Sequence, residues 1–247
     1  MSTDKDWEKW GSDNPYYGVL SDSKFLGSAL DEKMEQEFFE AGRGDIDQLM
    51  SRVHALGGGR FKHAVDFGSG VGRLTIPLAS HASKVTGLDV SPSVIEEAKK
   101  KTPKKLASKI AYALSDDQLS HLPKNYDLVY SNIVIQHIPL KRGYRIIEEL
   151  LGNLDYKGFA ALQITFTYEA PLFKRSVIYA RNHFVPLHYL LNILRGNQWN
   201  SPRMRMHLYS REKISKLFKS AGITETIQLA TDHGGYIGAM IIGQKKA

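Results

Sequence analysis

Short apolar runs alternate with amphipathic helical patterns between residues 64 and 166. Runs of this length that are rich in Val, Ile, Leu, Tyr and Phe are typical of buried strands. We expect five such strands, at residues 64–67, 84–89, 110–114, 126–131 and 158–166. The intervening segments have helical spacing, as in residues 141–154, where Ile146, Ile147, Leu150 and Leu151 share one face. This alternation predicts an α/β fold with a doubly wound, mostly parallel sheet.

Two helices are expected before the first strand, an acidic one over residues 30–41 and a second over residues 45–56. The second has an apolar face of Ile46, Leu49, Met50 and Val53, and it ends at three consecutive glycines. The alternation stops after residue 167 and returns at Ser210, which is expected to cap a helix. Residues 224–229 and 236–243 then predict a final antiparallel pair of strands.

These patterns divide one domain into four parts. Residues 1–43 form an N-terminal arm or lid, and residues 44–167 form the core. Residues 168–207 are predicted to be a helical cap inserted over the site, because they interrupt the alternation and contain five large aromatic side chains. Residues 208–247 complete the core.

The arm is too rich in aromatic side chains to be a disordered leader. Its rings either dock on the core or cover a ligand pocket. Tyr16 and Tyr17 are the candidates for contact with a substrate under the second interpretation.

A glycine-rich turn follows the first strand, with Gly68, Gly70 and Gly72 at alternate positions. Such a turn lets the backbone approach a ligand closely, and Ser69 and Arg73 belong to the same turn. Arg73 stands where the nicotinamide fingerprint has its third glycine, and no Gly-Lys-Ser/Thr follows as in a P-loop. Asp66 would repel a pyrophosphate but suits a cationic amino-acid head group. A turn that binds no ligand is the alternative.

The second strand ends on an acid, Asp89, followed by Val90 and then by Ser91-Pro92 at the start of a helix. A carboxylate at this place can accept hydrogen bonds from both hydroxyls of a ribose. The alternative is that Asp89 only helps to cap the helix.

Composition excludes several kinds of chemistry. The chain of 247 residues has no cysteine, so disulfides, thiolate metal sites and a cysteine nucleophile are ruled out. The first residues do not resemble a signal peptide and no apolar run reaches transmembrane length, so we expect a cytoplasmic protein. The net charge of +7 is uneven: residues 1–40 carry ten acids and four bases, whereas residues 170–211 carry seven bases and no acid.

Three motifs together resemble the class I S-adenosylmethionine-dependent methyltransferases of the Rossmann-like superfamily. They are Asp66-x-Gly68-x-Gly70-x-Gly72, the run Gly87 to Pro92, and the fourth strand with the Gln136-His137-Ile138-Pro139 segment after it. The resemblance covers about residues 40–166, with residues 208–247 consistent with the end of that fold. It implies a seven-stranded sheet whose last strand is antiparallel, and S-adenosyl-L-methionine as cofactor.

The resemblance also implies roles for single residues. Asp66, Gly68 and Gly70 would bind the methionine moiety and Asp89 the ribose. Either Asp116 or Asp117 would contact the adenine, and the sequence does not choose between them. Ser131, Asn132 and Ile133 would lie beside the sulfonium. His137 would be a general base or would only order the loop.

Residues and motifs that the sequence lacks narrow the class of methyl acceptor. Without cysteine, methylation of cytosine C5 through a thiol adduct is excluded, and the Ser131-Asn132-Ile133-Val134 sequence lacks the Asn/Asp-Pro-Pro-aromatic motif of amino-group methylation. No set of carboxylates suggests a metal. We therefore expect transfer to an oxygen of a small molecule, sugar or lipid-like acceptor.

The basic cap predicts an anionic group on that acceptor, bound by Arg203, Arg205 and His207. The composition also allows a homodimer and a peripheral membrane contact through the cap. One alternative is an RNA methyltransferase or nucleic-acid binder that uses the same bases, although the acidic arm argues against it. The other is a non-catalytic methyltransferase-like partner protein.

Overall fold

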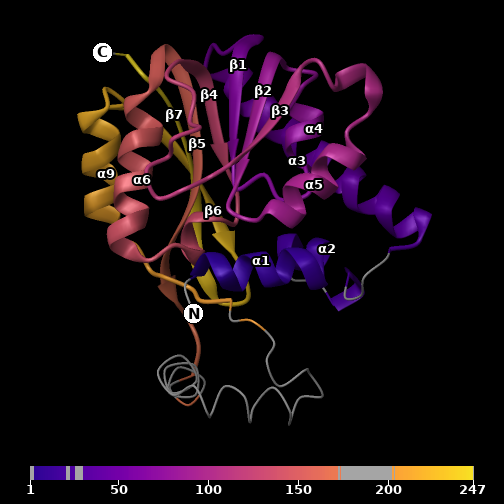
Figure 1. The fold of residues 1–247 in the computed structure, drawn as a ribbon. Helices are drawn as coiled ribbons and strands as arrows, with labels where there is room; N and C mark the ends of the chain where they lie inside the picture. The colour runs from indigo at the N-terminus through magenta and orange to yellow at the C-terminus, as the bar shows by residue number, and fades with distance from the viewer. Residues whose placement is uncertain are drawn as a thin grey trace.

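The structure, a computed structural model, describes residues 3–20, 23–25, 30–171, 173, 202 and 204–246. Arg203 and most of the predicted cap lie outside these residues. A seven-stranded sheet in the order β3-β2-β1-β4-β5-β7-β6 forms the centre of the molecule (Figure 1). Its strands are β1 (Phe61–Phe67), β2 (Ala82–Asp89), β3 (Ile110–Leu114), β4 (Tyr126–Ser131), β5 (Leu154–Tyr168), β6 (Thr226–Asp232) and β7 (Tyr236–Gln244).

The first five strands are parallel, and β7 runs antiparallel to both of its neighbours. The predicted doubly wound sheet with its antiparallel strand is therefore confirmed. Apolar side chains alternate between the two faces of β5: Ala160 and Leu162 belong to one hydrophobic cluster, and Ala161 belongs to another. A strand buried on both faces in this way gives the continuous apolar run that the sequence shows.

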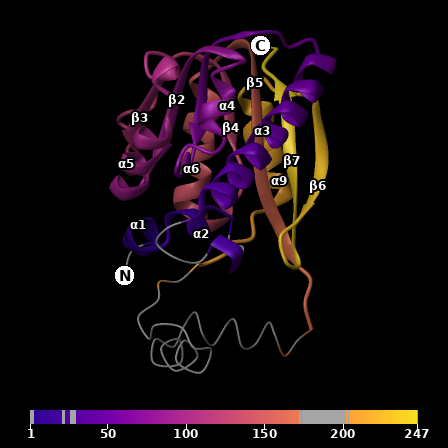
Figure 2. The same ribbon diagram turned by 90° about the vertical axis from the view of Figure 1, so that its right-hand side faces the viewer.

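Helices cover both faces of the sheet (Figures 1 and 2). One face carries α3 (Glu32–Ala55), α4 (Thr75–Leu78) and α5 (Pro92–Lys101), and the other carries α6 (Leu140–Gly152) and α9 (Arg211–Ser220). Short 3-10 turns lie at η1 (Ser23–Phe25), η2 (Lys104–Leu106) and η3 (Ile135–His137). The arm contributes α1 (Thr3–Asp13) and α2 (Pro15–Leu20), which lie across the ends of the strands in both views.

The prediction of two helices over residues 30–56 is wrong, because α3 is one continuous helix of 24 residues. Gly42 and Gly44 weaken helical propensity in the sequence pattern. Gly42 is nevertheless buried in the helix, and a side chain there would collide with the backbone carbonyl of Arg73. Tertiary packing of Phe38 and Ile46 on either side of Gly42 outweighs the local propensity.

Gly143 in α6 lies against the ring of Tyr209, whose hydroxyl is held 3.0 Å and 2.8 Å from the carbonyl oxygens of Ile135 and Ile138. Gly143→Ala should therefore lower the free energy of unfolding by about 1–3 kcal/mol, since the added methyl overpacks this contact. Denaturant titration measures the change. Gly152→Ala in the same helix is the matched control, because its new methyl meets nothing within 4 Å. A Gly143→Ala protein as stable as the Gly152→Ala control would contradict the packing argument.

Candidate functional site

The turn after β1 has a backbone that favours glycine at three positions. Gly68, Gly70 and Gly72 have φ angles of 80°, 51° and 85°, in the left-handed region. The N–H groups of Gly68 and Ser69 donate to the carbonyl of Leu88 at 2.7 Å and 3.0 Å, which fixes the turn against the end of β2. A side chain at Gly68 would collide with Val134, so the loop after β4 packs directly on the turn.

Asp89 joins this turn to the helix that follows β2. Its carboxylate accepts hydrogen bonds from Gly70 N at 2.9 Å and from Ser91 N at 3.0 Å. Burial raises the pKa of Asp89, the backbone hydrogen bonds oppose that rise, and the nearby Glu8 adds to it. The half-buried carboxylate lies at the carboxyl end of β2, beside the first turn of α5.

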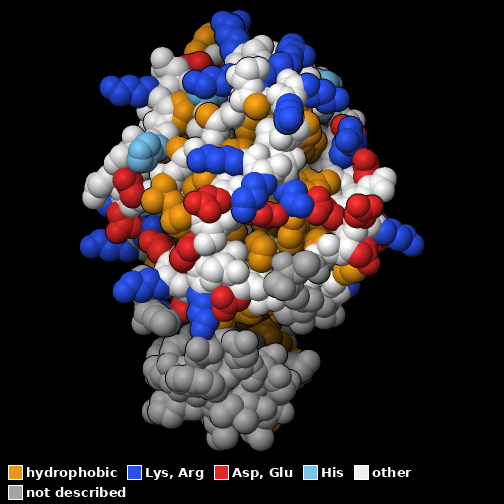
Figure 3. Space-filling model, turned by 45° about the vertical axis from the view of Figure 1, so that its right-hand side comes forward, with side chains coloured by type: hydrophobic (Ala, Val, Ile, Leu, Met, Phe, Trp, Pro, Cys, Tyr) orange, Lys and Arg blue, Asp and Glu red, His pale blue; other side chains and the backbone are white. Residues whose placement is uncertain are grey.

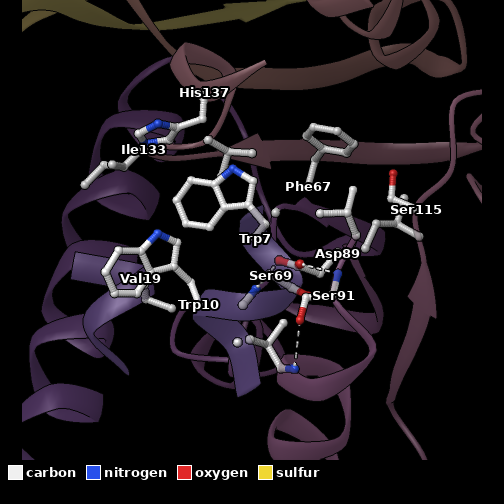
Figure 4. Close-up of a pocket in the computed structure, with 18 of the residues that line it drawn as sticks. Trp7, Trp10, Val19, Phe67, Ser69, Asp89, Ser91, Ser115, Ile133 and His137 are labelled. Atoms are coloured by element: carbon white, nitrogen blue, oxygen red, sulfur yellow. Dashed lines mark hydrogen bonds between the residues drawn. The ribbon is translucent and has the colours of Figure 1, made fainter. Parts of the chain in front are cut away.

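A pocket that is partly open to solvent lies between the glycine turn, the end of β2, the loop after β4 and the arm. The indole of Trp7 lies near its middle, with Ile133 and His137 on one side and Asp89 and Ser69 on the other (Figure 4). Two hydroxyls in the lining, those of Ser69 and Ser115, are buried and have no hydrogen-bond partner among the described residues. The pocket thus combines an apolar lining with a few converging polar groups, as ligand sites do.

Comparison with known proteins identifies the domain. Residues 64–158 match the protein family described as "Methyltransferase domain". A trans-aconitate 2-methyltransferase of Methylobacterium radiotolerans is 32% identical over 103 residues, and a magnesium-protoporphyrin O-methyltransferase of Synechocystis is 33% identical over 90 residues. These alignments cover 41% and 36% of this chain. The chain matches only 37% and 39% of the length of these curated relatives.

Solved structures agree in fold over nearly the whole chain. The magnesium-protoporphyrin IX methyltransferase of Synechocystis, crystallised with bound S-adenosylhomocysteine, superposes with a TM-score of 0.62 at 19% identity, covering 97% of this chain and 98% of that one. The N-methyltransferase NodS of Bradyrhizobium japonicum, also crystallised with S-adenosylhomocysteine, gives 0.55 at 16% identity, covering 95% and 100%. Residues 64–158 thus match a methyltransferase domain, within a fold that the chain shares with these structures.

The pocket brings together about half of the site residues predicted from the sequence. Its lining includes nine of them: Gly68, Ser69, Gly70, Arg73, Asp89, Val90, Asn132, Ile133 and His137. Nine others are described but are not part of the lining: Tyr16, Tyr17, Asp66, Gly72, Asp116, Asp117, Ser131, Arg205 and His207. Arg203, predicted to bind the substrate, lies outside the described residues.

Asp66 lies behind the glycine turn and not at the surface of the pocket. It is 1% exposed and accepts a hydrogen bond from Thr75 Oγ1 at 2.6 Å. Burial raises its pKa to about 6, although the Thr75 hydrogen bond opposes the shift. Arg73 lines the pocket, but its guanidinium forms an ion pair with Asp45 of α3 at 2.8 Å and lies over the ring of Phe38.

Neither acid after β3 lines the pocket. Asp116 accepts hydrogen bonds from the backbone N–H groups of Gln118 and Ser120, so it caps its own turn. Asp117 pairs with Arg142 at 2.8 Å. Ser115 lines the pocket instead. The sequence did not predict this residue, because the two carboxylates beside it were the stronger candidates for an adenine contact. The register of β3 gives a usable signal, since Leu114 pairs with Asp89 and Ser115 is the next residue.

The arm supplies Trp7, Trp10 and Val19 to the pocket, which the sequence analysis also missed. A side chain at Gly70 would come within 2.7 Å of Val19, so the arm closes directly over the glycine turn. The two predicted tyrosines pack elsewhere. Tyr16 contacts Phe38 edge to face and donates to Glu97 at 2.9 Å, and Tyr17 lies against Trp10.

Polar contacts fix α1 at both ends of the pocket. Asp4 pairs with Arg142 at 2.6 Å, and Glu8 accepts hydrogen bonds at 2.6 Å from the hydroxyls of Ser91 and Ser93 in the first turn of α5. Burial works against the charge on Glu8, but these hydrogen bonds prevail and hold its pKa below the ordinary value. Close packing adds to them, because a side chain at Gly11 would come within 3.4 Å of Ser91 Cβ.

His137 is nearly buried at the end of the pocket beside Trp7, with the two ring centroids 4.8 Å apart. Its Nδ1 lies 2.8 Å from the carbonyl oxygen of Arg205. Because a carbonyl only accepts, Nδ1 carries the proton and Nε2 keeps its lone pair. Burial lowers the pKa of His137 to about 4, so the ring is neutral at pH 7. Arg205 thus contacts the site through its backbone, and His207 does likewise, donating its N–H to the carbonyl of Gln136 at 2.7 Å.

Glu8→Gln should loosen the docked arm, since it keeps the size of the side chain but removes the charge that Ser91 and Ser93 bind. Hydrogen exchange measured by mass spectrometry should show faster exchange in residues 3–13. Glu37→Gln, on an exposed position of α3, is the matched control and should leave that exchange unchanged.

The effect of Glu8 should depend on pH with a definite sign. Because the folded-state pKa of Glu8 lies below its ordinary value of 4.5, its charge stabilises the docked arm above about pH 4.5, and this stabilisation is lost as the pH falls through the folded-state pKa. The difference between wild type and Glu8→Gln should therefore disappear at low pH. Equal exchange of both proteins at pH 7 would show that Glu8 does not hold the arm.

Proposed function

We propose that this protein transfers a methyl group from S-adenosyl-L-methionine to an oxygen of a small-molecule acceptor. The observation that carries the proposal is Asp89 at the carboxyl end of β2, which lines the pocket and bonds directly to Gly70 of the glycine turn, within a sheet of this topology. Relatives with this fold were crystallised with S-adenosylmethionine or S-adenosylhomocysteine bound. In open α/β sheets, ligands bind at this edge of the strands.

The residues of the pocket fit such a cofactor. Asp89 would accept hydrogen bonds from the ribose hydroxyls, and the glycine turn would admit the amino-acid portion because it has no side chains there. The hydroxyls of Ser69 and Ser115, which have no partner among the described residues, would supply two more polar contacts, and we assign Ser115 to the adenine. Asp66, buried behind the turn, would contribute through its charge only. When bound, the cofactor supplies a methyl group activated by the sulfonium, so the protein chiefly aligns the reacting atoms.

Two observations favour an acceptor oxygen that is already ionised, and a carboxylate is the acceptor group that fits them best. A neutral histidine with a pKa of about 4 is a weak base for an alcohol, and His137 is the only histidine among the described residues of the lining. A carboxylate needs no base at pH 7. The name of one curated relative also specifies a carboxylate, trans-aconitate, and the other is named as an O-methyltransferase. The fold does not choose the acceptor atom, since NodS is an N-methyltransferase.

A homodimer and a peripheral membrane contact through the cap, both expected from the sequence, stay proposals. None of the helices in the described part of the chain is long and apolar enough to span a membrane. In the same residues, no group of three or more His, Cys, Asp or Glu side chains is arranged to hold a metal ion. A nucleic-acid partner has less support, because Asp4 of the acidic arm lines the pocket and Glu8 of the same helix contacts Ser91 beside it.

Asp89→Ala should weaken binding of S-adenosylhomocysteine by roughly 2–4 kcal/mol, since charge-assisted hydrogen bonds to two hydroxyls are lost. Isothermal titration calorimetry measures the dissociation constant. Asp127→Ala is the matched control: Asp127 also accepts from two backbone N–H groups, those of Lys62 and His63, but at the start of β1, the opposite end of the sheet. Equal affinities for wild type and Asp89→Ala would exclude the ribose assignment.

A carboxylate acceptor predicts a methyl ester as product, which releases methanol in mild alkali. We expect transfer of tritiated methyl to trans-aconitate or a related polycarboxylate, with the label becoming volatile after alkaline treatment. The rate should stay flat between pH 6 and 8, because the pKa of His137, about 4, lies below that range. An alkali-stable product formed on a hydroxyl compound would contradict the carboxylate and would leave the cofactor proposal standing.

A further inference from the structure

The loop after β4 contains a strained residue at the pocket. Ile133 has a φ of 59°, in the left-handed region, and its side chain is β-branched. A residue of this kind in that region costs about 1–2 kcal/mol, so the surrounding structure must hold it there. Ile133 lines the pocket next to Asn132, on the side of His137 (Figure 4).

The side chain of Gln163 provides that hold. Gln163 lies in the middle of β5, is 0% exposed, and pairs in register with Met240 of β7. Its Oε1 accepts a hydrogen bond from the backbone N–H of Ile133 at 3.2 Å. A primary amide in the centre of a sheet is costly unless its polar atoms are bonded, so its place in β5 is explained by the bonds it makes.

The amide nitrogen of Gln163 extends the contact into a network. Nε2 lies 3.3 Å from Thr231 Oγ1 in β6 and 3.4 Å from Thr165 Oγ1 in its own strand. Thr165 Oγ1 in turn donates to Gln136 Oε1 at 3.0 Å. The two ends of the loop, at Ile133 and Gln136, are therefore bonded to the same buried group of side chains.

Contacts on the other sides fix the rest of the loop. Ser131 Oγ donates to the carbonyl of Phe67 at 2.8 Å, and the ring of His137 is held by the carbonyl of Arg205. Gln163 is thus the described side chain that bonds to the strained residue itself. Its loss would release Ile133 while the neighbouring anchors remain.

We propose that Gln163 is a positioning residue for methyl transfer, which acts through Ile133 to fix the pocket-side backbone of residues 132–133. The proposal rests on the proposed function and on the position beside the sulfonium that the sequence resemblance implies for residues 131–133. Displacements near 1 Å at a reacting centre reduce rates by roughly a hundredfold, so a strained but fixed backbone serves alignment there.

The test compares binding of S-adenosylmethionine and S-adenosylhomocysteine to the full chain. The two ligands differ only by the methyl group and the positive charge on sulfur, so the ratio of their dissociation constants reports on the surroundings of that sulfur. Gln163→Met keeps the length of the side chain but removes its hydrogen bonds. We expect this ratio to change about tenfold, while the affinity for S-adenosylhomocysteine stays nearly unchanged. The reason is that the displaced backbone affects only the surroundings of the sulfur.

Two further variants separate positioning from stability. Gln163→Glu keeps an oxygen for Ile133 N–H and should retain the slow exchange of the Ile133 amide, a readout that does not depend on the charge of the sulfur. Thr231→Val removes a partner of Gln163 but leaves the bond to Ile133, and it should lower the melting temperature without changing the ratio. Exchange of the Ile133 amide with solvent, followed by NMR, should accelerate in Gln163→Met only. If Gln163→Met does not fold, Gln163→Asn replaces it, because the shorter amide does not reach Ile133.

The outcomes distinguish the two proposals. A wild-type protein that binds neither ligand would refute the proposed function. A wild-type protein that binds both, together with an unchanged ratio and unchanged Ile133 exchange in Gln163→Met, would refute the role of Gln163 alone.

Discussion

The carboxylate of Asp89 is the contact on which the pocket depends. It bonds the glycine turn after β1 to the first turn of α5, and so joins two loops that are 19 residues apart in sequence. Glu8 binds Ser91 and Ser93 in that same turn, so the arm docks on a surface that Asp89 has already ordered. The N-terminus of a helix stabilises both negative charges, although burial, and after it the charge of Glu8, raises the pKa of Asp89.

Charge explains the composition of the arm. Acidic side chains of residues 1–40 form ion pairs with cations of the core. Asp4 pairs with Arg142, and Glu35 pairs with Lys101. Acidic and basic side chains are accordingly intermixed on the side of the molecule towards α3 and α5 (Figure 3). Contacts of this kind are individually weak at a surface, but several of them act together with the burial of Trp7 and Val19 to hold the arm.

The sequence predicted what depends on local pattern. The strands β3 and β4 begin and end where their apolar runs do, and Gly70 and Asp89 meet because parallel strands place their carboxyl ends at one edge. The features that it missed depend on tertiary contacts. The continuity of α3 through Gly42 depends on the packing of Phe38 and Ile46 against the core, and the entry of Trp7 into the pocket requires the docking of α1. The hydrogen bond between Ile133 N–H and Gln163 joins residues 30 positions apart, and no local sequence pattern in β5 predicts it.

The close approach of Gly11 to Ser91 offers a place where an engineered disulfide could lock the arm. An ideal Cβ at Gly11 would lie 3.4 Å from Ser91 Cβ, close to the spacing of about 3.5–4.5 Å that a disulfide spans. The chain has no cysteine of its own, so a pair introduced at these two positions could bond only with each other within one molecule. Oxidant would then fasten the roof of the pocket covalently and reductant would return it to its ordinary non-covalent contacts, so the route by which ligands enter could be studied in a single protein.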